Sequence, residues 1–310
     1  MNTGVFLFRL FRQAIFFSLL IFLAADSIAA GDLPKEGDTK VPPLVSSAWL
    51  RENIADHQLI ILQVTATRLD YDNGHLPGAH FLWPGYVMIS TEKETTVPAP
   101  VKDVTRLLRS MGVNNDSHII LCGSNGNLIS VCRVFVNLEH YGLKGRVSVL
   151  DGGLEAWKAA GYEVSKDIPP ARKGKFTASL HKNLADGSFM ADNLTNKSYF
   201  IIDARPKYQY EGSVESPRSG HIPGAKNLPQ PDMYNHQTVI FADTETITES
   251  FRKLGMPPGS RPVLYCNTGN SASVCYVAAI IAGYDPILYD GSMEEWGNRH
   301  DLPVEKKLQP

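Results

Sequence analysis

The stretch Val263-Leu264-Tyr265-Cys266-Asn267-Thr268-Gly269-Asn270-Ser271-Ala272 decides the fold and the candidate chemistry of this chain. The apolar residues before Cys266 predict a buried strand. The run from Ala272 to Ala282 is apolar on nearly every side and predicts a buried helix that ends at Gly283. A short polar loop with one glycine joins the two. Cys266 is therefore expected at the carboxyl end of a strand, beside the loop N–H groups and the start of a helix.

This position favours a reactive cysteine at residue 266. A nest of backbone N–H groups at a helix start stabilises an anion. It also lowers the pKa of a thiol, to roughly 3.5–7.5 in reactive cysteines. The expected species is a thiolate, or a thiolate that carries an extra sulfur. The alternative that these residues leave open is a buried core cysteine, which is common in proteins.

Residues 1–30 have the pattern of a secretory signal peptide. Arg9 and Arg12 precede an apolar run from Ala14 to Ala25, and residues 27–30 are small enough for cleavage. The run is short for a bilayer span, so an uncleaved anchor is the less favoured alternative. We expect an exported chain in a Gram-negative periplasm, with no membrane attachment after cleavage. The formal net charge of -2 gives no sign of a nucleic-acid partner.

The four cysteines indicate duplication instead of a disulfide framework. Cys122 and Cys132 stand in the first half as Cys266 and Cys275 stand in the second, with a spacing that differs by one residue. The chain has no C-x-x-C pair and no Cys/His spacing typical of zinc. We therefore expect no metal.

The order of predicted elements also repeats, which indicates two similar domains. In the first half we expect a helix over 44–50 capped by Ser46 or Ser47, strands at 59–64, 118–122 and 147–150, a turn at 74–80, a helix over 101–111, and a helix that runs to about residue 141. In the second half, residues 199–205, 220–225, 263–266 and 287–296 match these in order. We place the first domain at 40–165, a linker at 166–177 and the second domain at 178–310.

Strands that alternate with helices predict an α/β fold, in which each domain has a parallel sheet with helices on both faces. Ligands of such sheets bind beyond the carboxyl ends of the strands, where Cys266 is expected.

Both halves resemble rhodanese domains, and residues from about 40 to 310 resemble a tandem-domain sulfurtransferase. The matching stretches are 203–205, 221–225, the Cys266 loop and 290–296 in the second half, and 75–79 and 150–157 in the first. The resemblance implies that the Cys266 thiolate takes a sulfane sulfur from a small donor such as thiosulfate or 3-mercaptopyruvate. The persulfide then passes that sulfur to a thiol or to cyanide. It also implies a monomer that needs no cofactor.

The resemblance places further residues around the persulfide. These candidates for substrate or persulfide binding are Asn267, Thr268, Gly269, Asn270, Ser271, Arg205, Arg218 and His75. Thiosulfate-preferring relatives carry two basic residues after the cysteine, where this chain has Asn267 and Thr268. Mercaptopyruvate-preferring relatives use two arginines, of which Arg205 matches the first and Gln209 stands at the second. Neither donor preference transfers cleanly.

Two other functions remain open at this stage. One is a sulfur carrier whose persulfide is handed on without turnover. The other is a thiol-dependent phosphatase or arsenate reductase, which Ala272 disfavours because such enzymes need an arginine there. The first domain is expected to be inactive. Its cysteine, Cys122, stands at the end of a strand, but residues 63–65 lack the Asp-Ala-Arg sequence of the second half.

Overall fold

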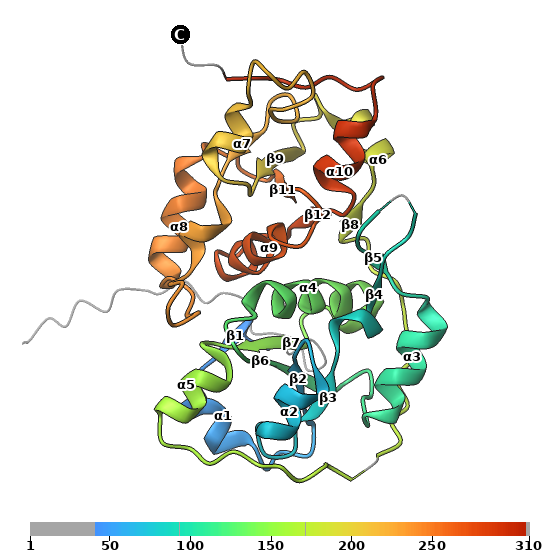
Figure 1. The fold of residues 1–310 in the computed structure, drawn as a ribbon, viewed down its shortest axis with the longest axis vertical. Coiled ribbons are helices and arrows are strands. Elements are labelled where there is room, and N and C mark those ends of the chain that lie inside the picture. The colour runs from blue at the N-terminus through green and yellow to red at the C-terminus, as the bar shows by residue number, and fades with distance from the viewer. Residues whose placement is uncertain (1–40, 93, 171, 308–310) are drawn as a thin grey trace, which may run out of the picture. The chain divides into compact units, whose positions relative to one another are not determined.

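Two five-stranded parallel sheets form the centres of the two halves (Figure 1). The computed structural model describes residues 41–92, 94–170 and 172–307, so the predicted signal peptide lies outside the described residues. The first sheet has the order β1 (Leu44–Val45), β7 (Val147–Leu150), β6 (His118–Gly123), β2 (Leu59–Val64), β3 (His80–Leu82). The second has the order β10 (Lys226–Asn227), β9 (Tyr199–Asp203), β11 (Arg261–Tyr265), β12 (Ile287–Tyr289), β8 (Leu184–Ala185). Read from opposite ends the two orders are equivalent, which confirms the predicted repeat.

The helices and short elements of the first half are α1 (Ser47–Asn53), α2 (Arg68–Asn73), α3 (Val101–Ser110), α4 (Leu128–Leu138), α5 (Gly153–Ala159), a 3₁₀ turn at Pro84–Tyr86 and the hairpin strands β4 (Met88–Ile89) and β5 (Val97–Pro98). Those of the second half are α6 (Gly187–Asn193), α7 (Lys207–Glu211), α8 (Thr244–Lys253), α9 (Ala272–Ile281), α10 (Ser292–Asn298) and a 3₁₀ turn at Gln230–Met233.

Central strands of both sheets are buried on both faces because helices cover each side. Every residue of β2 is buried, and so are the last four of β11. This is why these strands read as continuous apolar runs instead of alternating ones. The predicted α/β class, with parallel sheets and helices on both faces, is confirmed.

One predicted helix boundary is wrong. Residues 44 and 45 form edge strand β1 and pair with Val149 and Leu150, so the first helix begins only at Ser47. Ser46 caps it, because its Oγ accepts a hydrogen bond from the Trp49 N–H at 3.1 Å. The helix expected to run to about residue 141 is α-helical to Leu138 and continues directly as a π-helical turn over Glu139–Leu143.

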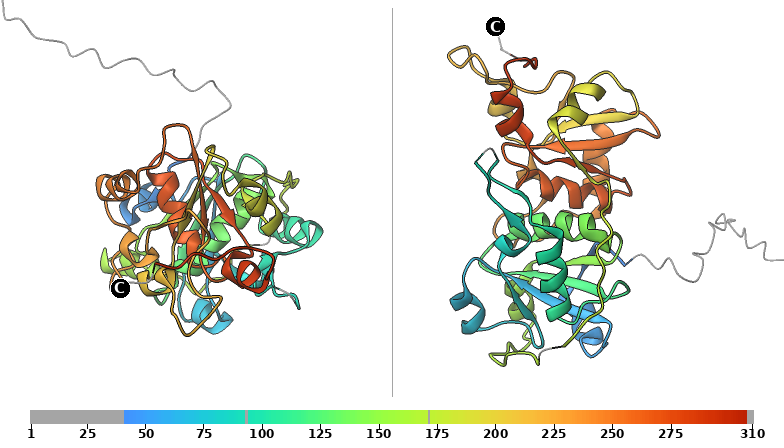
Figure 2. Two further views of the ribbon diagram at one scale, coloured as in Figure 1. Left: turned by 90° about the horizontal axis from the view of Figure 1, so that it is seen from above. Right: turned by 90° about the vertical axis from the view of Figure 1, so that its right-hand side faces the viewer.

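The two halves share one apolar core. Helices α4 and α9, one from each half, pack against each other, and residues of both belong to a single buried cluster (Figure 2). Within this interface the Tyr276 hydroxyl donates to Oε2 of Glu139 at 2.8 Å. Burial raises the pKa of the Glu139 carboxyl. The described residues between 41 and 307 form one compact unit.

The segment predicted as a linker is bonded along the first half. Ser165, the residue just before this segment, exchanges backbone hydrogen bonds with His75, and within the segment the Gly174 N–H donates to Arg109 O at 2.8 Å. Phe176 N–H donates to Val113 O at 3.0 Å and its side chain is fully buried. These contacts fix the path of the chain between the two sheets.

Within the described part of the chain, none of the helices has the length and apolar character needed to cross a membrane.

Candidate active site

Cys266 stands directly between strand β11 and the loop that leads to α9, as expected from the sequence. The residue is 1% exposed. Its N–H donates to Oγ of Ser292 at 3.1 Å, and its carbonyl accepts from Met293 N–H at 3.1 Å. The start of α10 therefore holds both backbone polar groups of the cysteine. Ser292 adopts a left-handed φ of 51°, which is unusual for a serine, and its role was missed in the sequence.

The loop after Cys266 keeps its backbone donors free. Within the described chain, the N–H groups of residues 267 to 271 donate to no carbonyl, side chain or carboxylate. The loop carbonyls, by contrast, are bonded: Asn267 O accepts from Glu294 N–H at 2.8 Å, and Gly269 O accepts from Ser273 Oγ at 2.9 Å. Unused donors beside a cysteine are a setting that stabilises an anion.

Gly269 is required by the shape of this loop. Its φ is 75°, in the left-handed region, and a Cβ there would lie 2.7 Å from the Asp290 carbonyl oxygen. Any side chain would push the loop away from the segment that precedes α10.

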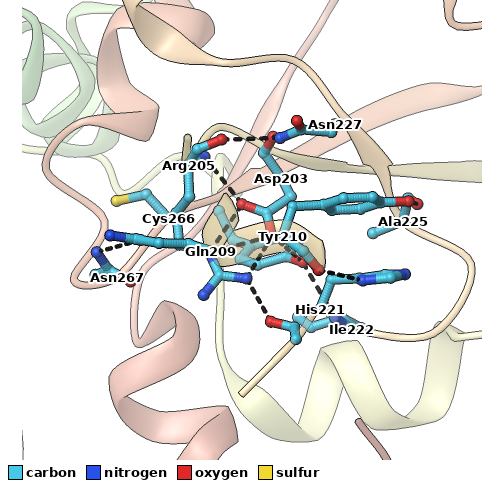
Figure 3. Close-up of polar contacts among 12 residues, drawn as sticks. Asp203, Arg205, Gln209, Tyr210, His221, Ile222, Ala225, Asn227, Cys266 and Asn267 are labelled. Carbon is cyan, nitrogen blue, oxygen red and sulfur yellow. Dashed lines mark hydrogen bonds and ion pairs between the residues drawn. The ribbon is translucent and has the colours of Figure 1, made fainter. Parts of the chain in front are cut away.

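A buried ion pair lies beside the cysteine at the end of β9 (Figure 3). The Arg205 guanidinium donates to both carboxylate oxygens of Asp203, with Nη2 to Oδ2 at 2.6 Å, and also to Gly220 O at 2.6 Å. The Tyr265 hydroxyl donates to Asp203 at 2.8 Å and accepts from Ile222 N–H. These bonds join the end of β9 to β11 and to the turn that begins at Gly220.

The sulfur of Cys266 points away from this ion pair in Figure 3. Arg205 thus has a structural partner, and contact between it and a donor stays a prediction. Gln209, which stands at the position of a second arginine in some relatives, accepts a hydrogen bond from Asn267 Nδ2 at 3.0 Å. Its amide therefore lies at the loop, although it carries no charge.

The first half contributes residues to this site that sequence reasoning missed. The loop of the β4–β5 hairpin reaches the second half: Thr96 Oγ1 donates to Thr268 O at 2.6 Å. Thr95 donates to the Glu294 carboxylate through its N–H, at 2.7 Å to Oε2, and through its hydroxyl. No local pattern in the sequence indicates this contact, because the partners are far apart in the chain.

A fully buried arginine from the first half lies behind the same loop. Arg133, on α4, forms an ion pair with Asp290. Its Nη1 lies 3.3 Å from the point where a Gly269 Cβ would stand, and Nη1 and Nε have no partner in the described chain. Burial raises the pKa of the Asp290 carboxyl, and the nearby Arg133 charge opposes this rise.

Two predicted site residues make their contacts elsewhere. The ring nitrogens of His75 lie 2.9 Å from Tyr71 O and 3.0 Å from Asp167 O, and its ring stacks on Tyr71. Each guanidinium nitrogen of Arg218 donates to main-chain carbonyls in or after the second half of α10. The structure does not bring either side chain to the Cys266 loop through any bond among the described residues.

The equivalent loop of the first half begins at Gly123, because the strand register sets Gly123 level with Cys266 and Cys122 level with Tyr265, one residue away from the predicted match. Cys122 is fully buried, and its Sγ donates to Gly123 O at 3.3 Å. Asn125 N–H donates to the Glu155 carboxylate at 2.8 Å, and the N–H groups of Asn127 and Leu128 donate to loop carbonyls. Burial, followed by the charge of Glu155, raises the pKa of the Cys122 thiol well above its usual value.

Comparison with known proteins identifies relatives for the whole two-domain unit. The sequence profile of the rhodanese-like domain matches the chain twice, over residues 46–160 and 186–299. The chain is 29% identical over 284 residues to 3-mercaptopyruvate sulfurtransferase of Escherichia coli strain K12, which covers 84% of this chain and 97% of that protein. It is 27% identical over 268 residues to thiosulfate sulfurtransferase of Azotobacter vinelandii, which covers 86% and 97%.

A solved structure shows the same arrangement. The crystal structure of SseA, a 3-mercaptopyruvate sulfotransferase from Escherichia coli, superposes with a TM-score of 0.69 at 26% sequence identity. The superposition covers 81% of this chain and 99% of that one.

Proposed function

The chain belongs to the rhodanese-like family and is a sulfurtransferase, and from this premise we propose that Cys266 carries the sulfur between donor and acceptor. The free N–H groups of residues 267–271 are the observation that carries this proposal. These N–H groups belong to the loop that directly follows Cys266, and no oxygen of the described chain accepts a hydrogen bond from any of them. This setting suits a residue that alternates between thiolate and persulfide, both of which are anions.

In the first step the Cys266 thiolate attacks the outer sulfur of the donor. With thiosulfate, a sulfur–sulfur bond forms to Cys266, the donor's own sulfur–sulfur bond breaks, and sulfite leaves with the electron pair. With 3-mercaptopyruvate, the carbon–sulfur bond breaks and pyruvate leaves after it takes up a proton. The loop N–H groups hold the negative sulfur of the resulting persulfide.

In the second step an acceptor thiolate or cyanide attacks the outer sulfur of the persulfide. The bond to Cys266 breaks, the thiolate returns to the loop N–H groups, and the product is a new persulfide or thiocyanate. Both steps are nucleophilic displacements at sulfur. The sulfur of Cys266 carries negative charge as the thiolate and as the persulfide, so the same loop N–H groups stabilise it in both steps.

A turnover assay tests this proposal and its alternative. We expect the purified protein to form many equivalents of thiocyanate from thiosulfate and cyanide. The sulfur-carrier alternative predicts that one equivalent of persulfide forms and that catalytic release to cyanide does not follow. Absence of both turnover and persulfide would contradict any role of Cys266 in sulfur chemistry.

For the donor we propose that thiosulfate is accepted weakly. Asn267 and Thr268 lack the charge that would hold a dianion, and Gln209 offers an amide where a second arginine would bind a carboxylate. The loop N–H groups supply part of the lost attraction. A high KM for thiosulfate, compared with that for less charged sulfane donors, is the expected kinetic result.

We further propose that the chain is exported to the periplasm as a monomer and that residues 1–30 are removed. The basic, apolar and small-residue segments of the leader support this. Sequencing the N-terminus of protein from the native host should give a start near Ala30 or Gly31. An intact Met1 on membrane-bound protein would identify an anchor instead, and light scattering would test the monomer.

A further inference from the structure

The two halves differ in what one equivalent carboxylate does. The stretch from Asp151 to Trp157 repeats the stretch from Asp290 to Trp296, so Glu155 of the first half corresponds to Glu294 of the second. In the first half Glu155 accepts a hydrogen bond from the Asn125 N–H, inside the loop that follows Cys122. An internal carboxylate thus occupies a donor that an external anion would use.

In the second half the corresponding carboxylate is held away from the loop donors. Both oxygens of Glu294 accept hydrogen bonds from Thr95, through its N–H and its hydroxyl. Glu294 nevertheless lies directly at the loop, since its own N–H donates to Asn267 O at 2.8 Å. The backbone of Glu294 is thus attached to the loop. If the hydrogen bonds to Thr95 are removed, the Glu294 side chain is free to turn toward the unused N–H groups of that loop.

We propose that Thr95, from the non-catalytic half, is a positioning residue that keeps Glu294 out of the anion cradle of Cys266. This inference rests on the proposed function of that cradle. The neighbouring Thr96 holds the loop itself through Thr268 O, at 2.6 Å, so the hairpin fixes the loop and the carboxylate together. The first half then has a defined task at the active site, although Glu155 occupies a donor of its own equivalent loop.

The surroundings of Glu294 make this restraint necessary. The pKa of Glu94, beside Thr95 in the hairpin, is raised by burial and then by the carboxylates of Glu295, Asp290, Glu294 and Asp186. Repulsion among these carboxylates favours movement of the Glu294 side chain away from the cluster, and the loop whose Asn267 O binds the Glu294 N–H offers unused donors. Thr95 supplies the two hydrogen bonds that oppose this movement.

The test uses the full chain with Thr95→Val, which removes the hydroxyl, and Thr95→Asp, which also repels Glu294. Thr105→Val is the matched control, because its hydroxyl bonds only within α3, to Val101 O. We expect the kcat/KM for thiosulfate to fall about tenfold in Thr95→Asp and less in Thr95→Val. Adding Glu294→Gln to Thr95→Asp should restore most of the loss, because a neutral amide does not compete as an anion.

A second readout does not depend on turnover. The rate at which iodoacetate alkylates Cys266, divided by the rate for neutral iodoacetamide, measures how well the cradle accepts an anion. This ratio should fall in Thr95→Asp and return with Glu294→Gln, while Thr105→Val leaves it unchanged. The proposal is overturned if Thr95→Asp changes neither readout, slows both reagents equally, or is not rescued. Lack of thiosulfate turnover in the unaltered protein would instead contradict the proposed function, and the alkylation ratio would still test Thr95.

Discussion

The loops that follow β6 and β11 stand at the same place in two equivalent sheets, but the strand register sets Gly123 level with Cys266 and Cys122 level with Tyr265. In the first loop, the N–H groups of Asn125, Asn127 and Leu128 bind Glu155 and two loop carbonyls. In the second, the N–H groups of residues 267–271 have no acceptor in the described chain. Cys122 lies in the core cluster on the face of its sheet that Tyr265 occupies in the second half, so a cysteine near the end of a strand does not by itself make a sulfur-transfer site. The backbone donors around it must also be unoccupied.

A second difference lies next to each cysteine. In the first half the neutral Gln63 donates to Gly74 O and accepts from Leu76 N–H. In the second half, the equivalent backbone groups of Gly220 and Ile222 are reached by Arg205 and Tyr265, which both bond to Asp203. In the first half, Gln63 alone therefore binds the two backbone groups that Arg205 and Tyr265, together with Asp203, bind in the second half.

The largest effect is expected when the two cysteines are exchanged for serine. Cys266→Ser should lower kcat for thiosulfate and cyanide by roughly three orders of magnitude or more, because no other group can form the persulfide. Cys122→Ser should retain most of the activity, since Cys122 is fully buried, stands level with Tyr265 and not with Cys266, and three N–H groups of the loop after it already bind acceptors. Steady-state thiocyanate formation measures both. The reverse pattern would place the active site in the first half.

The buried charge network should dominate stability in the second half. Asp203→Asn leaves the Arg205 guanidinium buried without its carboxylate, and we expect the free energy of unfolding to drop by roughly 3–5 kcal/mol. Asp72→Asn, which breaks the exposed pair with Arg68, should cost less than about 1 kcal/mol. Urea denaturation measures both. Equal losses would contradict the structural role assigned to Asp203.

The sequence was sufficient to predict the repeat, the family and the sulfurtransferase class, and the family match confirms these predictions. The signal came from residues close together in the chain, such as the Cys266 loop and the Asp-Gly stretch before Trp296. Edge strand β1 was missed because an apolar pair before a helix cap also fits a longer helix. Thr95, Arg133 and Ser292 were missed because their partners lie in other elements.

A third test introduces into the Cys266 loop the two positive charges that thiosulfate-preferring relatives carry and this chain lacks. Asn267→Arg with Thr268→Lys should raise kcat/KM for thiosulfate at least about tenfold, because each charge-assisted contact contributes roughly 1.5–3 kcal/mol when well formed. Persulfide formation from an uncharged donor should change much less. An unchanged efficiency in a folded double variant would mean that other groups already hold the anion.

The smallest expected effect is a pH dependence that arises at His118 in the first half. Burial lowers the pKa of His118 to about 4 from 6.5, and Arg261 stands at the equivalent place in the second half. Between pH 6.5 and pH 4, His118 therefore binds a proton in the unfolded chain but not in the folded chain. The free energy of unfolding consequently falls as the pH decreases from 6.5 toward 4. His118→Gln should flatten this part of the profile in urea denaturation. An unchanged slope would exclude His118 as its cause.

The most direct test of the central claim is to locate the persulfide. The protein is exposed to thiosulfate, its thiols are blocked, and its peptides are compared by mass spectrometry. The open cradle predicts one additional sulfur atom on the peptide that contains Cys266, with Cys122, Cys132 and Cys275 unmodified. An additional sulfur on Cys122, with none on Cys266, would contradict the account.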